Sequence, residues 1–237
     1  MHDSRRRGDQ VDDDRNGVVC SEAAVTLGYW SALSVTVAGV AYLLVISVLM
    51  ATGKFTLPLP DSVELFAAWD TIASGPLLVT ALVAVHGLVP AARRPFAQLG
   101  VVFAAVFMVM VSINRFVQLT VIRPSMLEGN TSGLERFMPY GPRSAMLSLE
   151  LVGWGFFLGL ALLSAAFAFS RGGISGKVRW CFLGYAVLGI ASAMLFVADS
   201  PYSAIGFVAW GVILPVGTAF LTAWFNRMRK PSGVAGR

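Results

Sequence analysis

The chain has 237 residues, of which 56% are hydrophobic and 13% are charged, and its formal net charge is +5. A soluble domain carries roughly 25% charged residues, and the mean hydropathy of +0.71 is too high for a core bounded by water alone. A soluble globular protein is therefore excluded. Nucleic-acid binding is also disfavoured, because the basic residues flank apolar segments and form no stripe. They fit topology signals and contacts with membrane lipids.

Both ends of the chain are polar. Residues 1–28 combine the basic run Arg5-Arg6-Arg7 with the acidic run Asp12-Asp13-Asp14. This composition predicts a disordered N-terminal tail. We expect residues 228–237 to form a second, short tail and residues 29–227 to form one transmembrane domain.

Six long apolar stretches occupy the region between the tails. A helix needs about 20 predominantly apolar residues to cross a membrane. We therefore predict an all-α bundle of six spanning helices. Their expected ranges are 30–52, 66–90, 96–122, 144–169, 178–198 and 203–226. The second helix is expected to start earlier than its apolar part, with Asp61 as its cap and Glu64 three residues later.

The basic residues predict an orientation for this bundle. Thirteen of the eighteen Lys and Arg residues fall on the side of both termini, four fall on the other side, and Arg115 lies inside the third helix. Short cytoplasmic segments carry the excess of Lys and Arg in multi-pass proteins. Both termini should therefore be cytoplasmic.

One long connector, residues 123–143, lies on the predicted outer side. It is rich in Gly, Pro, Asn and Ser, and it contains a candidate short helix with Ser132 and Glu135 as capping residues. An ordinary solvated loop explains this composition. A lid over an outward-facing site is the functional alternative, with Tyr140 as an aromatic wall.

The third helix carries polar residues at membrane depth. Arg115 lies about 7 residues, or about 10 Å, from the outer end of this helix. An unpaired arginine at that depth costs a few kcal/mol or more. Asn114 and Gln118 are four residues apart and Arg115 and Gln118 are three apart, so the three side chains form one polar patch.

The fourth helix carries the most plausible partner for Arg115. Glu150 lies at a similar depth, and a carboxylate–guanidinium pair would satisfy both groups. Trp154 follows one turn later on the same face, and Asp70 lies near the outer end of the second helix. A structural ion pair and a ligand or ion site remain alternatives for this cluster. No catalytic set can be assigned from the pattern.

Small residues predict a close helix contact. Gly155 and Gly159 form a small-xxx-small motif in the fourth helix, and packing within the bundle is favoured over dimerisation. Neither His-x-x-His nor paired Cys-x-x-Cys spacing occurs, and no phosphate-binding glycine loop is present. We therefore expect no metal and no cofactor.

Two segments carry a resemblance to known proteins. Residues 113–118 (Ile-Asn-Arg-Phe-Val-Gln) and 150–159 (Glu-Leu-Val-Gly-Trp-Gly-Phe-Phe-Leu-Gly) resemble those of uncharacterised six-helix integral membrane proteins of bacteria. The resemblance covers most of the chain after the N-terminal tail and implies six helices in a bacterial cytoplasmic membrane. It implies no activity.

These observations favour a membrane protein that binds a small molecule, an ion or a lipid from the outer face, as a transporter-like or sensory component. One alternative is an accessory subunit that assembles with another membrane protein. A second is a membrane enzyme acting on a lipid or isoprenoid, with Glu150 or Asp70 as its acid. The residue pattern favours the enzyme least.

Overall fold

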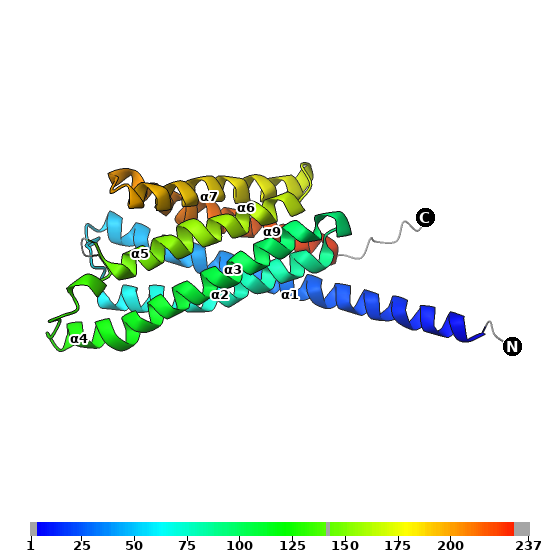
Figure 1. Ribbon diagram of the computed structural model, residues 1–237, viewed down its shortest axis with the longest axis horizontal. Helices are drawn as coiled ribbons and strands as arrows, with labels where there is room; N and C mark the ends of the chain where they lie inside the picture. Colours follow the sequence, from blue (N-terminus) through cyan, green and yellow to red (C-terminus); the bar gives the residue numbers. More distant parts are fainter. Residues whose placement is uncertain (1–3, 141–142, 230–237) are drawn as a thin grey trace.

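The protein is a bundle of long helices in a computed structural model that describes residues 4–140 and 143–229 (Figure 1). Within these ranges the chain forms helices and connectors and no strand. Six helical segments are long and apolar enough to cross a membrane. The predicted fold class, an all-α bundle with six spans, is therefore confirmed.

The first three spans comprise the elements from α1 to α4. The first is α1 (Ser4–Ala51), and the second is α2 (Asp61–Leu88). The third is continuous from residue 91 to 127. It consists of η1 (Ala91–Arg93), α3 (Arg94–Val117), the π-helical turn η2 (Gln118–Ile122) and α4 (Arg123–Leu127).

Two of the remaining three spans also contain π-helical turns. The fourth span consists of α5 (Ala145–Leu151), the π-helical turn η4 (Val152–Phe157) and α6 (Leu158–Ala168), and the fifth is α7 (Gly173–Val197). The sixth consists of η5 (Pro201–Ile205), α8 (Gly206–Val208), the π-helical turn η6 (Ala209–Ile213) and α9 (Leu214–Arg229). A single 3-10 turn, η3 (Glu135–Phe137), lies in the described part of the connector after α4.

The spans pack in chain order. α1 packs against α2, α2 against α3, α3 against α6, α6 against α7 and α7 against α9, and α9 then returns to α1. The start of α1 and the end of α9 lie at the same end of the bundle, here called the terminal end (Figure 1). The opposite end, which holds α4 and the described residues 128–140 of the connector, is called the loop end.

The structure describes α1 from Ser4, within the region for which the sequence predicts an N-terminal tail. Residues 1–3 and 230–237 lie outside the described residues. No proline interrupts residues 4–51, and helix extension from an existing helix adds one hydrogen bond per ordered residue. The apolar spanning part of this helix begins at Glu22.

The third span also extends beyond its predicted end at residue 122. Pro124 suggests a helix end, because proline lacks an N–H and its ring clashes with the carbonyl four residues earlier. That carbonyl belongs to Thr120, which lies inside the π-helical turn η2. The widened turn accommodates the proline, so the helix continues as α4. The first five residues of the expected loop 123–143 are consequently helical.

Two predicted caps are also wrong. Pro60, rather than Asp61, is the N-cap residue of α2, and it makes no side-chain capping bond. Leu134, rather than Ser132, precedes the short turn η3. Asp61 has another partner, Arg123, because the third span is long enough to reach it.

The glycine motif of the fourth span packs inside the bundle, as predicted. A Cβ atom on Gly155 would lie 2.8 Å from the carbonyl oxygen of Gly189 in α7, and one on Gly159 would lie 2.7 Å from Ile190. Both distances are too short for a real Cβ contact. The two glycines therefore permit the close approach of the fourth and fifth spans.

Candidate functional site

The predicted ion pair between Arg115 and Glu150 is present at the loop end of the bundle. The Arg115 Nη2 atom donates to Oε1 of Glu150 at 2.5 Å, and the two side chains are only 12% and 19% exposed. Arg115 comes from the last turn of α3 and Glu150 from α5. The antiparallel course of these two spans gives the two residues a similar depth.

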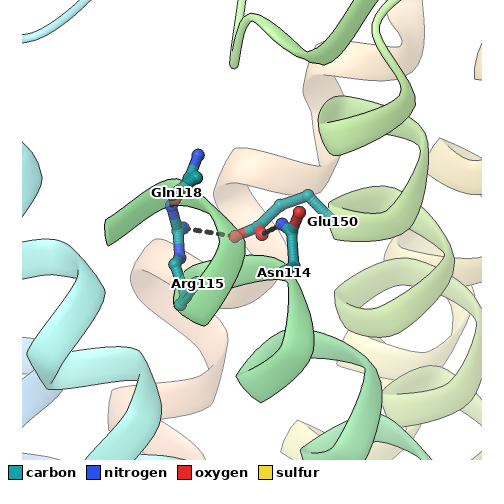
Figure 2. A network of polar contacts seen from close by, with 4 residues as sticks. All are labelled: Asn114, Arg115, Gln118 and Glu150. Atoms are coloured by element: carbon teal, nitrogen blue, oxygen red, sulfur yellow. Dashed lines mark hydrogen bonds and ion pairs between the residues drawn. The ribbon is translucent and has the colours of Figure 1, made fainter. Parts of the chain in front are cut away.

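Two amide side chains complete this arrangement (Figure 2). Asn114 Nδ2 donates to the second oxygen of Glu150 at 2.6 Å, and Arg115 Nη1 donates to Oε1 of Gln118 at 2.7 Å. Both Glu150 oxygens therefore accept a charge-assisted or amide hydrogen bond from α3. We call Asn114, Arg115, Gln118 and Glu150 the polar cluster.

The polar cluster leaves some of its hydrogen-bonding capacity unused. Asn114 is 1% exposed. Its Oδ1 atom and the Nε atom of Arg115 are buried and have no hydrogen-bond partner among the described residues. A buried polar atom without a partner costs about 1–3 kcal/mol. The cluster thus offers one free acceptor and one free donor in addition to its internal bonds.

Glu64 in α2 is the most informative residue that the sequence interpretation missed. Its Oε1 atom is buried and also lacks a hydrogen-bond partner in the described parts of the chain. Glu64 belongs to the electrostatic surroundings of Arg115, together with Glu150, Tyr140 and Tyr42. A third polar element therefore approaches the cluster from α2.

Helical spacing could have identified Glu64. Ala68, Thr71 and Gly75 are buried on one face of α2, and Gly75 approaches Met108 of α3. Glu64 precedes Ala68 by four residues and so continues this face toward the loop end. We had interpreted Glu64 only as a helix-start residue, because its spacing from Asp61 matches a capping box.

A groove of about 190 Å³ lies between the start of α2 and the end of the third span. Its apolar wall includes Leu65, Leu119 and Ile122, and its polar residues include Glu64 and Gln118. Gln118 belongs to both the groove and the polar cluster. The interpretation of the cluster as a ligand site implies a pocket lined by Arg115 or Glu150, but neither lines this groove. Gln118 lines it and accepts a hydrogen bond from Arg115.

An ion pair joins the two walls of the groove. Arg123 donates through Nε and Nη2 to the two carboxylate oxygens of Asp61, at 2.7 and 2.9 Å. Both residues also line the groove. Because the two charges neutralise each other, they connect α2 to α4 without adding net charge.

The connector after α4 contributes to the site through its last described residues. Pro139 lines the groove, and Tyr140 is half-buried beside it. Burial, followed by the negative charge of Glu64 and a side-chain hydrogen bond to it, raises the pKa of the Tyr140 hydroxyl far above its ordinary value, although Arg115 acts in the opposite direction. The hydroxyl is therefore neutral at physiological pH and donates to the Glu64 carboxylate.

Two other predicted site residues lie outside the polar cluster. Asp70 is half-buried in α2 and has Arg115 in its electrostatic surroundings, but it makes no hydrogen bond or ion pair to another described residue. Trp154 packs edge-on against Phe107, with ring centres 4.9 Å apart. Its backbone carbonyl, in the π-helical turn η4, accepts a hydrogen bond from the buried Tyr185 hydroxyl. Trp154 therefore belongs to the packed core.

The site does not present a metal-binding geometry. No group of three His, Cys, Asp or Glu residues could hold a metal ion in the part of the chain that the structure describes. Comparison with known proteins adds no assignment, because no family model, curated protein or solved structure matches this chain. The chemistry of the site must therefore be argued from its own residues.

Proposed function

We propose that this multi-pass membrane protein binds a small molecule, an ion or a lipid through the groove at its loop end, as a transporter-like or sensory component. The groove beside the polar cluster is the observation that supports this proposal. It combines an apolar wall with a buried carboxylate oxygen that has no partner among the described residues. Binding pockets in general combine apolar walls with a few polar groups that orient the ligand.

The proposal includes the orientation that the charge bias predicts. With both termini cytoplasmic, the loop end faces the outside of a bacterial cytoplasmic membrane. A ligand would then enter from the outer side. Arg115 and Glu150 would stabilise the floor of the site, and Gln118 would connect this floor to the groove.

The two alternatives receive less support. An accessory subunit would be favoured by an exposed small-residue face on the fourth span, but Gly155 and Gly159 pack against α7. An enzyme would be favoured by a deep apolar cavity that ends at Glu150 or Asp70, and neither residue lines the groove. Ligand binding is therefore the function that the site supports best.

Thermal unfolding of the purified protein in a neutral detergent tests this proposal. We expect at least one compound from a panel of lipids, ions and metabolites to raise the unfolding midpoint of the wild type. A ligand present at 100 times its dissociation constant adds about 2.7 kcal/mol to the stability. The Leu119→Trp variant, in which an indole occupies the groove, should lose this response.

Leu99→Trp is the matched control. Leu99 is an exposed apolar residue of the same third span, within α3, and lies outside the groove. This variant should keep the wild-type response. If Leu119→Trp kept the same stabilisation by every compound as Leu99→Trp, binding would lie elsewhere and the groove would be refuted as the site.

A further inference from the structure

The charges that line the groove do not balance. Its charged residues are Asp61, Glu64 and Arg123. Asp61 and Arg123 neutralise each other through two hydrogen bonds. Glu64 makes no ion pair with any described residue, and the nearby guanidinium of Arg115 is already paired with Glu150. The groove therefore carries one uncompensated carboxylate.

The carboxylate of Glu64 has the Tyr140 hydroxyl as a neutral hydrogen-bond partner, but one of its oxygens still needs a donor and its charge still needs a cation. Its Oε1 atom is buried without a partner among the described residues, and a buried charge is tolerated only when it is both paired and hydrogen-bonded. A metal cation would need several oxygen ligands, and no cluster of three acidic, His or Cys residues is present in the described ranges. A single carboxylate is better matched by an ammonium group, which carries both a charge and N–H donors.

The size and lining of the groove limit the rest of the ligand. A volume of about 190 Å³ is below the roughly 300–1,000 Å³ of pockets for drug-sized molecules. The groove can therefore enclose a headgroup. Met126 and Leu127 continue its apolar wall to the surface, where they are 39% and 64% exposed. An apolar chain attached to the headgroup would follow this wall into the lipid.

We propose that the groove binds an amphiphile with a protonated primary amine as its headgroup. The ammonium donates a hydrogen bond to Oε1 of Glu64, and the apolar chain lies against Leu119, Met126 and Leu127. This assignment rests on the proposed function, because it specifies the ligand class of the same groove. Charge complementarity and the unsatisfied acceptor together select an amine over an alcohol, an anion or a quaternary ammonium.

Three amphiphiles of equal chain length test the assignment. Decylamine is protonated at pH 7, because an alkyl amine has a pKa near that of lysine, about 10.4. Decanol has no charge, and decyltrimethylammonium has a charge but no N–H donor. In a neutral detergent, decylamine should stabilise the wild type. Decanol and decyltrimethylammonium should both bind at least about tenfold more weakly than decylamine.

Variants assign the effect to Glu64. Glu64→Gln keeps the shape of the side chain and removes its charge, and we expect it to weaken decylamine binding about tenfold or more. Glu128→Gln is the matched control, because Glu128 is an exposed carboxylate at the same end and does not line the groove. It should bind decylamine like the wild type. Partitioning of the amine into the micelles is the same for all three proteins and cancels.

The outcomes separate this inference from the proposed function. Equal binding of decylamine and decanol, abolished in both cases by Leu119→Trp, would overturn the amine headgroup while leaving the groove as a binding site. Equal binding of decyltrimethylammonium would overturn the hydrogen bond to Glu64. Unchanged decylamine binding by Glu64→Gln would also refute the assignment. A panel in which no compound stabilises the wild type would remove both proposals.

Discussion

The Glu150 carboxylate receives hydrogen bonds from two consecutive side chains of α3. Asn114 binds one of its oxygens and Arg115 binds the other, so a change at any of these residues leaves a buried polar group unsatisfied. Removing one partner of a buried ion pair is strongly destabilising, whereas replacing both partners by apolar residues is often tolerated. The ion pair therefore serves structural stability in addition to any role in ligand binding.

We predict that Arg115→Leu lowers the free energy of unfolding by about 3 kcal/mol, because Glu150 is left buried without its ionic partner. The double variant Arg115→Leu with Glu150→Leu should be more stable than Arg115→Leu alone. A double-mutant cycle measured by equilibrium unfolding in detergent gives the coupling energy.

The matched control for this cycle is the pair Asp61 and Arg123. Its side chains are 50% and 35% exposed, so solvent screens the interaction and its coupling should be much weaker. Additive effects of the Arg115 and Glu150 substitutions would contradict the coupling between those residues.

At the scale of the helices, π-helical turns allow two prolines to lie inside continuous spans. The carbonyl groups four residues before Pro124 and Pro215 belong to Thr120 and Gly211, and these residues lie in η2 and η6. A regular α-helix would bring each carbonyl against the proline ring. The turn η2 also begins at Gln118, where the polar cluster meets the groove. The irregular turn therefore lies at the site, as π-helical turns often do.

Close contact between the fourth and fifth spans provides a second test at this scale. We predict that Gly155→Ala lowers the free energy of unfolding by about 1–3 kcal/mol, the usual cost of overpacking, because its Cβ would meet the Gly189 carbonyl at 2.8 Å. Gly184→Ala is the control, since its Cβ would meet only Ile213, at 3.8 Å. Thermal unfolding of both variants in detergent measures the difference. Equal midpoints would show that the helices can separate without cost.

For the whole molecule, an even number of spans brings both ends of the described chain to the terminal end (Figure 1). α9 packs against α1, so the sixth span closes the bundle. The groove lies at the opposite end, between the second and third spans. Which end faces the cytoplasm therefore decides from which side a ligand can enter.

We predict that Lys54→Cys and Ser132→Cys, at the loop end, react with a membrane-impermeant maleimide in intact cells. Gly172→Cys, at the terminal end, should react only after permeabilisation, because the charge bias assigns this end to the cytoplasm. Cys20 and Cys181 are replaced by serine so that only the introduced thiol reacts. Labelling of Gly172→Cys in intact cells, with Lys54→Cys protected, would reverse the orientation.

Much of the architecture follows from the sequence alone. The six spans can be counted because a helix needs about 20 apolar residues to cross a membrane. Such a stretch is a local property of the chain. The pairing of Arg115 with Glu150 was also predictable, since an intramembrane charge requires a partner and the depth of each residue follows from its distance to a helix end.

Only the tertiary structure identified the groove and the role of Glu64. Local patterns favoured a capping box at Asp61 and Glu64 and a helix end before Pro124, and both interpretations were wrong. Asp61 binds Arg123, 62 residues away, and the π-helical turn extends the third span far enough to reach it. A groove is formed by side chains from separate spans. Its shape and its unbalanced charge therefore depend on how the helices pack, which no single segment of the sequence encodes.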